Sequence, residues 1–80
     1  MIDAAIVRVQ QAPLREVVRD HRGTIVGTIE RQQLVGRLIA RDRQGLVVGL
    51  YEERSRVTRD AHGRIVGRAN LLPALLFQRR

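Results

Sequence analysis

The chain has 80 residues and a formal net charge of +7, carried by fifteen arginines without a single lysine. Eighty residues make one small domain, close to the lower size limit for a core that is stable alone. Cysteine is absent, so neither a disulfide nor a thiolate metal site can reinforce the core, and self-association is the remaining common route to stability.

The first part of the chain predicts two strands joined by a turn. Residues 4–9 and 14–19 contain several β-branched side chains, which favour strands. Between them Gln10 to Pro13 can turn the chain, because proline fixes φ and cannot donate to a β-ladder. These segments are the first two of seven expected strands.

A nine-residue motif then occurs three times. It reads RDHRGTIVG at 19–27, RDRQGLVVG at 41–49 and RDAHGRIVG at 59–67. With its flanks it fits the consensus [V/I]-x-R-D-x-x-G-x-[I/V]-V-G, and this many shared positions make internal repetition the strongest signal in the sequence. The repeat copies extend over residues 17–29, 39–51 and 57–69.

Each Asp-x-x-Gly segment has the composition of a tight turn. Aspartate favours the first position of a type I turn, where its carboxylate can accept a hydrogen bond from a backbone N–H two residues further on. Glycine tolerates the positive φ that a bulged hairpin needs at the last position. We therefore expect β-hairpins with tips at 20–23, 42–45 and 60–63. Their structural turn residues are Asp20, Gly23, Asp42, Gly45, Asp60 and Gly63.

Weaker turn signals at 31–33 and 52–55 divide the remaining chain into short strands. The seven expected strands are 4–9, 14–19, 24–30, 34–41, 46–51, 56–59 and 64–69. Connections this short favour antiparallel neighbours and leave no room for helical crossovers. The expected fold is all-β: one domain over residues 1–80, formed by a small antiparallel meander or barrel-like β-hairpin repeat with a short C-terminal helix.

Strand alternation predicts which side chains share a face. Ile25, Gly27 and Ile29 are expected on one side of their strand and Val26 on the other, and the other two copies follow the same pattern. The second glycine of each copy is thus expected on an apolar side, where another group approaches closely. The middle copy is apolar on both sides (GLVVGL), which suggests a strand covered on both faces, in a nearly closed β-structure or a dimer.

The apolar tail, residues 70–77, differs from the rest of the chain. Asn70 can cap a short helix in which an early proline is tolerated, and LLPALLF has almost no polar face. This tail can cover the open end of its own β-core, or it can insert into a neighbouring subunit. Its candidate assembly contacts are Leu71, Leu72, Leu75, Leu76 and Phe77.

The three motif copies resemble the units of four-fold β-flower domains, which are short hairpin-repeat domains. The resemblance covers residues 17–69 and rests on RDHRGTIVG, RDRQGLVVG and RDAHGRIVG. It implies an all-β, non-enzymatic module built for interaction or assembly. In addition, LVGRLIARDRQGLVVG is similar to the opening of PRC-barrel domains, small β-barrels that dock other proteins.

No catalytic or metal-binding group stands out in the sequence. His21 and His62 fall at different places within hairpin tips, and Ser55, the only serine, has no neighbouring histidine to activate it. The three motif aspartates are already explained by the turns. We therefore expect no enzyme activity, no cofactor and no metal.

One polar feature recurs beside the turn, namely Arg19, Arg41 and Arg59. If the copies are related by pseudo-symmetry, these three guanidiniums form an equivalent set. Each can pair with a nearby carboxylate or lie in solvent. Alternatively the set can contact phosphate or carboxylate groups of a partner, which a planar guanidinium binds with two hydrogen bonds.

The sequence favours a non-enzymatic structural or interaction subunit that forms a homo-oligomer or docks into a larger assembly, such as a virion. The alternative is a nucleic-acid-binding module that holds phosphates on an arginine-rich β-surface, although a coding bias toward arginine would explain the charge equally well. Apolar runs are far shorter than the roughly 20 residues of a membrane helix, and no signal peptide is recognisable. We expect a cytoplasmic or virion-associated protein that does not enter a membrane.

Overall fold

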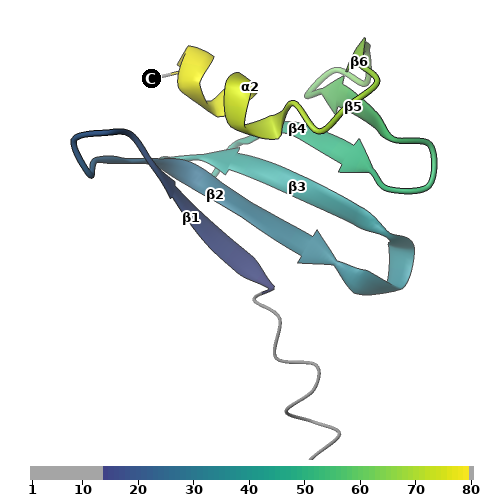
Figure 1. Ribbon diagram of the computed structural model, residues 1–80, viewed down its shortest axis with the longest axis horizontal. Coiled ribbons are helices and arrows are strands. Elements are labelled where there is room, and N and C mark those ends of the chain that lie inside the picture. Colours follow the sequence, from purple (N-terminus) through teal and green to yellow (C-terminus); the bar gives the residue numbers. More distant parts are fainter. Residues whose placement is uncertain (1–13, 80) are drawn as a thin grey trace, which may run out of the picture.

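A computed structural model describes residues 14–79, which form six β-strands and a C-terminal helix (Figure 1). The elements are β1 (Arg15–Arg19), β2 (Ile25–Gln32), the 3-10 turn η1 (Gln33–Val35), β3 (Arg37–Asp42), β4 (Val47–Glu52), β5 (Val57–Asp60), β6 (Ile65–Gly67) and α2 (Leu72–Arg79). The strand expected at 4–9 and the turn expected at 10–13 lie outside the described residues.

The six strands form one antiparallel sheet in chain order. Each strand pairs with the next one along the chain, which makes the sheet a meander, as the short connections predict. Within the described residues the sheet is open, because β1 and β6 are its two outer strands and do not pair with each other. The all-β antiparallel fold with a short terminal helix is confirmed, whereas closure into a barrel is not confirmed for this part of the chain.

The connections fall at two ends of the sheet because successive strands run in opposite directions. The three Asp-x-x-Gly turns, at 20–23, 42–45 and 60–63, join β1 to β2, β3 to β4 and β5 to β6. They therefore share one end of the strands, which we call the Asp-Gly end. The two other connections, at 33–36 and 53–56, share the opposite end, which we call the far end (Figure 1).

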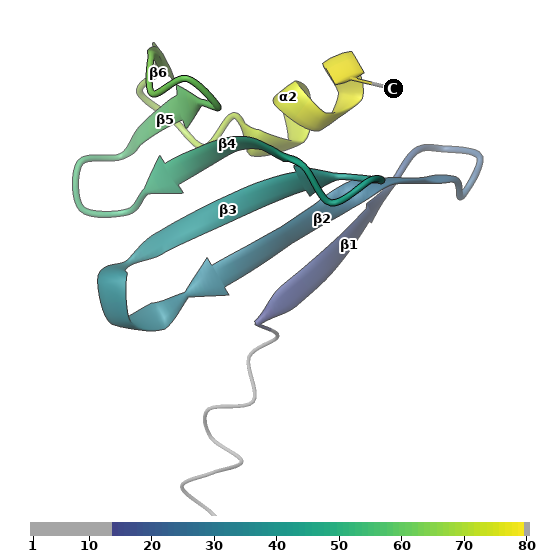
Figure 2. The same ribbon diagram turned by 180° about the vertical axis from the view of Figure 1, so that it is seen from behind.

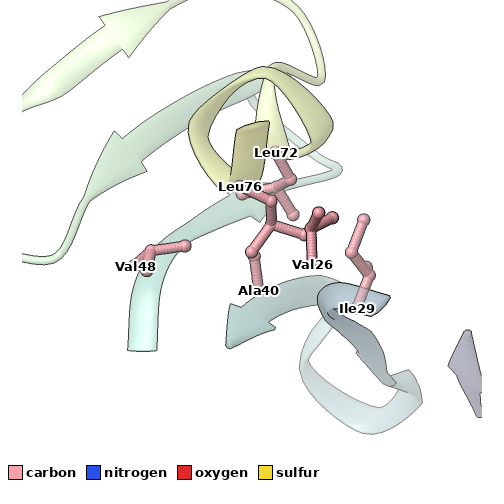
Figure 3. Packing of buried hydrophobic residues seen from close by; sticks show 6 residues of the cluster. All are labelled: Val26, Ile29, Ala40, Val48, Leu72 and Leu76. Atoms are coloured by element: carbon pink, nitrogen blue, oxygen red, sulfur yellow. The ribbon is translucent and has the colours of Figure 1, made fainter. Parts of the chain in front are cut away.

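The helix α2 covers one face of the sheet. It packs over β2, β3 and β4, and the turned view shows it on the same side of these strands (Figures 1 and 2). Leu72 and Leu76 of the helix are fully buried, and with four residues of the sheet they form the core (Figure 3). Those four are Val26, Ile29, Ala40 and Val48.

The segment that leads into α2 is held by two polar side chains. The hydroxyl of Thr58, which is fully buried on β5, donates to the carbonyl oxygen of Ala69 at 2.5 Å and accepts from the N–H of Leu71 at 3.0 Å. At the start of the helix, Oδ1 of Asn70 accepts from the N–H of Leu72 at 3.2 Å. Asn70 thus bonds to the first N–H of the helix, although the N-cap position itself is held by Leu71, whose carbonyl oxygen accepts the first helical hydrogen bond, from Leu75.

A β-bulge in the first motif overturns the expected assignment of faces. Consecutive residues of β1 pair with Gly27 and with Ile25, so Val26 is an extra residue in β2. The expectation that Ile25 shares a face with Gly27 and Ile29 is wrong, because one extra residue breaks the simple alternation. Val26 instead enters the core.

The same irregularity recurs in the other two motifs, where Val48 and Val66 are the extra residues. As a consequence Val26 and Val48 are buried, whereas Ile25 and Val47 are 40% and 39% exposed. Each motif therefore sends the valine next to its second glycine toward the helix side and the preceding aliphatic residue toward the opposite side.

The second glycine of each motif lies where other atoms approach closely, as expected. A Cβ added to Gly27 would overlap the carbonyl oxygen of Arg41, and one added to Gly49 would be 2.7 Å from the carbonyl oxygen of Arg59. Side chains of α2 press on the same places, with Cδ1 of Leu75 at 2.7 Å from that position at Gly49. These glycines let the neighbouring strand and the helix approach the sheet.

The strand expected at 34–41 begins later than predicted. Leu34 and Val35 belong to η1, and β3 begins at Arg37. Gly36 ends the 3-10 turn with a φ of 63°, a left-handed conformation that glycine adopts without steric cost. The pair of apolar residues at 34 and 35 is therefore part of the far end and not of the sheet.

Candidate interaction surface

The three Asp-Gly turns make the same hydrogen bonds. Oδ1 of Asp20 accepts from the backbone N–H groups of Arg22 and Thr24, at 2.9 and 3.0 Å. Asp42 and Asp60 accept from the N–H groups at the equivalent positions, at the same distances. The glycines that close these turns, Gly23, Gly45 and Gly63, have φ values of 86°, 88° and 86°. Each aspartate therefore holds its own turn.

The electrostatics of the third turn favour an ionised carboxylate. The hydrogen bond from the backbone N–H of Arg64 holds the pKa of Asp60 below its ordinary value. Partial desolvation opposes this effect, while the N–H of His62 and the charge of the Arg64 side chain reinforce it.

The arginine of each motif bonds to its own turn as well. Nη1 of Arg19, Arg41 and Arg59 donates to the carbonyl oxygen of the glycine four residues further on, at 2.9, 3.1 and 3.0 Å. Two of them also lie beside carboxylates: Nε of Arg41 is 3.1 Å from Oε1 of Glu30, and Nε of Arg59 is 3.6 Å from Oε1 of Glu52. The three guanidiniums occupy equivalent places, and their contacts within the chain stabilise the hairpins.

The face of the sheet that α2 does not cover, which we call the helix-free face, presents one cross-strand pair from each motif. An arginine of one strand lies opposite a β-branched residue of the next. The pairs are Arg19 with Ile25, Arg41 with Val47, and Arg59 with Ile65. The three aliphatic members are 40%, 39% and 58% exposed, so a large part of each is open to a partner.

The middle of the helix-free face is aliphatic. Ile39 and Leu50 face each other on β3 and β4 and are half-buried, and Val17 on β1 is 46% exposed. Five arginines of β1, β3 and β5 lie on the same face and outnumber its two glutamates, Glu30 and Glu52. They are Arg15, Arg19, Arg37, Arg41 and Arg59.

The apolar tail is folded against its own chain. Leu72 and Leu76 are fully buried and Leu71 and Leu75 are half-buried, whereas Phe77 is 37% exposed. Two roles were expected for the tail. The burial of these leucines agrees with the first, in which the tail covers the β-core of its own chain. It covers one face of the sheet and not the open end of a barrel, because the described strands form an open sheet.

Within residues 14–79, no three side chains of His, Asp or Glu gather in a way that could hold a metal ion. His21 and His62 belong to different turns, β1–β2 and β5–β6. No helix in this part of the chain is long and apolar enough to cross a membrane.

Comparisons of this chain with protein-family models, with curated proteins and with solved structures give no match. The resemblance to four-fold β-flower domains and to PRC-barrel domains therefore rests on the motif residues alone.

Sequence reasoning placed several exposed apolar residues wrongly. Ile25 and Val47 were expected on the covered side of the sheet, and Leu34 was expected in a strand. The signal that could have identified the first two is the run of two β-branched residues before the second glycine in every motif (I-V-G or V-V-G). In a bulge, one of two such neighbours faces the core and the other faces outward.

Proposed function

We propose that this protein is a non-enzymatic structural subunit that associates with other protein subunits through its helix-free face, in a homo-oligomer or in a larger assembly. The observation that carries the proposal is the row of exposed aliphatic residues, Ile25, Val47 and Ile65, which every motif contributes to the same face. Single exposed apolar residues are common on proteins, whereas these three recur at the same place in every motif, each opposite an arginine of the neighbouring strand.

The composition of the helix-free face suits a protein partner better than a nucleic acid. Interfaces between proteins have an apolar centre, and arginine is the cationic residue enriched in them. The aromatic side chains on which bases stack are missing from this face, since Tyr51 packs against the core on the helix side and Phe77 belongs to α2. Moreover, β4 is apolar on both faces, and α2 covers only one of them. A partner would supply the second cover.

The three copies of the motif correspond to three hairpins of the same sheet. Alternate strands of a sheet are roughly 9–10 Å apart, so three hairpins place three similar pairs of arginine and aliphatic residue on the same face of the sheet, each pair displaced along the strands from the one before. Three equivalent weak contacts together bind more strongly than one, and a single repeated motif is enough to encode all three.

The mass of the full chain in solution tests this proposal. We would measure light-scattering mass after nuclease treatment, at low and at high salt. Because arginines outnumber glutamates on the helix-free face, two copies repel each other at low salt, and screening together with stronger hydrophobic association should raise the mass at high salt. A monomer under both conditions would contradict self-association through this face.

Variants of the face make the test specific. Val47→Asp combined with Ile65→Asp should lower the mass at high salt, because both side chains are exposed and the change places charge in the proposed contact. Leu46→Asp is the matched control, since Leu46 is 56% exposed in the adjacent turn and outside the row. An equal loss of mass in the control and the double variant would reject the helix-free face as the contact.

The Asp-Gly end favours a second candidate function, the binding of a nucleic-acid backbone. Six arginines lie in or beside the three turns there, while the aspartates of those turns accept hydrogen bonds from backbone N–H groups. The arginines are Arg19, Arg22, Arg41, Arg43, Arg59 and Arg64. Phosphate binding weakens steeply as salt rises, the opposite direction from the association proposed above. Changing Arg19, Arg41 and Arg59 to Gln would flatten that salt dependence if this candidate were correct.

A further inference from the structure

Within residues 14–79, β1 is paired with another strand on one side only. At its start the N–H of Arg31 donates to the carbonyl oxygen of Leu14 at 2.7 Å. Hydrogen-bonded and non-bonded pairs alternate along an antiparallel ladder, so the backbone N–H and C=O groups of Glu16 and Val18 point toward β2. Those of Val17 point away from the described sheet. The outer edge of β1 can therefore accept a further strand.

The side chains of β1 leave both faces of this edge incomplete. Val17 is 46% exposed on the helix-free face. On the helix side, Val18 is half-buried against the border of the core, and Glu16 beside it is exposed. Among residues 14–79, Glu16 forms no ion pair. The edge thus offers one aliphatic side chain on each face, together with an unpaired carboxylate.

The segment that precedes β1 in the sequence carries side chains that complement this edge. Residues 4–9, outside the described part of the chain, read AAIVRV. With Arg8 opposite Glu16, two opposite charges face each other across the strands, and such pairs stabilise a sheet. The same register places two aliphatic residues of the segment opposite the two valines of β1. The pairs are Val7 with Val17 and Ile6 with Val18.

The neighbouring registers lose these matches. A shift by one residue in one direction places Arg8 opposite Arg15, and like charges directly opposite each other destabilise a sheet. A shift in the other direction places Arg8 opposite Val17 and leaves Glu16 without a cation. In the favoured register the connection consists of residues 10–14, and five residues are a common length for a hairpin loop.

We propose that residues 5–9 bind the outer edge of β1 in the same copy of the chain, as a further antiparallel strand with Arg8 opposite Glu16. The connection of five residues keeps the segment at a high effective concentration beside its own β1, which favours this edge over the edge of a second copy. The inference goes beyond the proposed function and does not depend on it. It adds Val7 beside Val17 on the helix-free face and leaves association to that face instead of the β1 edge.

Hydrogen exchange of the nuclease-treated full chain, followed for each residue by NMR, tests the inference without a substitution. The N–H of Val17 should exchange slowly, like that of Val18, because the added strand accepts its hydrogen bond. The protection should be the same at every protein concentration. Exchange of Val17 at the unprotected rate, while Val18 stays protected, would overturn the inference. Protection of Val17 that rises with concentration would assign the edge to a second copy and overturn it as well.

Engineered cysteines test the register, since the chain has no cysteine of its own. Val7→Cys with Val17→Cys should form a disulfide within one molecule, because the Cα atoms of a bonded antiparallel pair are about 5.5 Å apart. Ile6→Cys with Val17→Cys is the matched control. A difference of one residue directs the two side chains to opposite faces, so this pair should stay reduced. Equal oxidation of the two pairs would rule out the proposed register.

Exchange of the two charges gives an independent check. Arg8→Glu and Glu16→Arg should each accelerate hydrogen exchange at Val17, and the double variant should restore the slow rate because the charge pair is re-formed. A double variant that exchanges as fast as the single variants would contradict the pairing. Val47→Asp with Ile65→Asp, which tests the proposed function, should leave exchange at Val17 unchanged. Failure of either proposal is therefore visible without failure of the other.

Discussion

Arg41 and Gly45 are joined by a hydrogen bond 3.1 Å long, from Nη1 of the arginine to the carbonyl oxygen of the glycine. The same bond joins the arginine and the glycine of the other two motifs. The arginine thus bonds to the end of the turn, while the aspartate next to it accepts hydrogen bonds from two backbone N–H groups of the same turn. R-D-x-x-G is therefore one structural unit, and a partner would contact its arginine through the donors that remain.

Replacement of Arg41 should weaken the fold measurably. Arg41→Gln removes the hydrogen bond to Gly45 and the ion pair with Glu30. Because the side chains of Arg41 and Glu30 are partly exposed, the free energy of unfolding should fall by only about 1 kcal/mol. Arg43→Gln removes the same charge from an exposed position in the same turn and should change it by less than about 0.5 kcal/mol. Urea unfolding measures both values, and equal values would show that the contacts of Arg41 contribute nothing.

Gly45 and Gly49 are required for different reasons, and substitutions should separate them. Gly45 has a φ of 88° with no atom within 4 Å of an added Cβ, whereas a Cβ on Gly49 would lie 2.7 Å from the carbonyl oxygen of Arg59. Asparagine tolerates left-handed backbone, so Gly45→Asn should cost less than Gly45→Val, whose β-branch resists positive φ. Gly49→Ala should cost about 1–3 kcal/mol through overpacking.

Thermal melts of these glycine variants measure the order of stability. We expect Gly45→Asn to be closest to the wild type and Gly49→Ala and Gly45→Val to lie well below it. If Gly45→Val melts at the wild-type temperature, positive φ is not needed at that turn. A neutral Gly49→Ala would mean that β5 and α2 can move away from β4 without loss.

Thr58 should be the most important polar side chain for attaching α2 to the sheet. Thr58→Val keeps the shape and the β-branch but removes both the bond to Ala69 and the bond from Leu71, inside a fully buried site. The expected loss of unfolding free energy is about 1–3 kcal/mol, because the groups left behind lose their partner. Thr28→Val, in a half-buried place on the helix-free face, is the control and should be nearly neutral. Equal urea midpoints for the two variants would contradict this role of Thr58.

The turns and the order of strands could be predicted from the sequence because they depend on contacts within a few residues. Asp20 and Gly23 determine their hairpin through bonds that span at most five positions. Strand boundaries at the three motifs are accordingly close to those expected. The hydrogen bond of Asn70 is likewise local, because it reaches only to Leu72, where the helix begins.

The faces of the sheet could not be predicted in the same way. Whether Ile25 or Val26 enters the core depends on a bulge, which arises from the pairing of two strands and not from either strand alone. The helix-free face exists because α2 covers β2, β3 and β4 on one side only. No local sequence pattern predicts on which side of a sheet a short apolar helix packs. Leu34 is exposed because Gly36 turns the chain before β3 begins, an effect that a hydrophobicity pattern does not contain.

The third turn should make stability depend on acidity. The N–H of Arg64 and its neighbours hold the pKa of Asp60 below the ordinary value in the folded protein. The unfolded chain therefore binds more protons as the solution becomes acidic. The stabilisation by this carboxylate is complete above the unfolded pKa of about 3.9, and it is lost as the pH falls through the lower folded value.

Asp60→Asn isolates this contribution, because the amide oxygen can still accept from the backbone of the turn but does not titrate. Wild type and variant should differ most in urea midpoint near neutral pH, with the wild type more stable. The difference should shrink steadily once the pH is below about 4, as the wild-type carboxylate becomes neutral like the amide. Two curves that stay parallel down to the acid limit would show that the ionised form of Asp60 does not hold the turn.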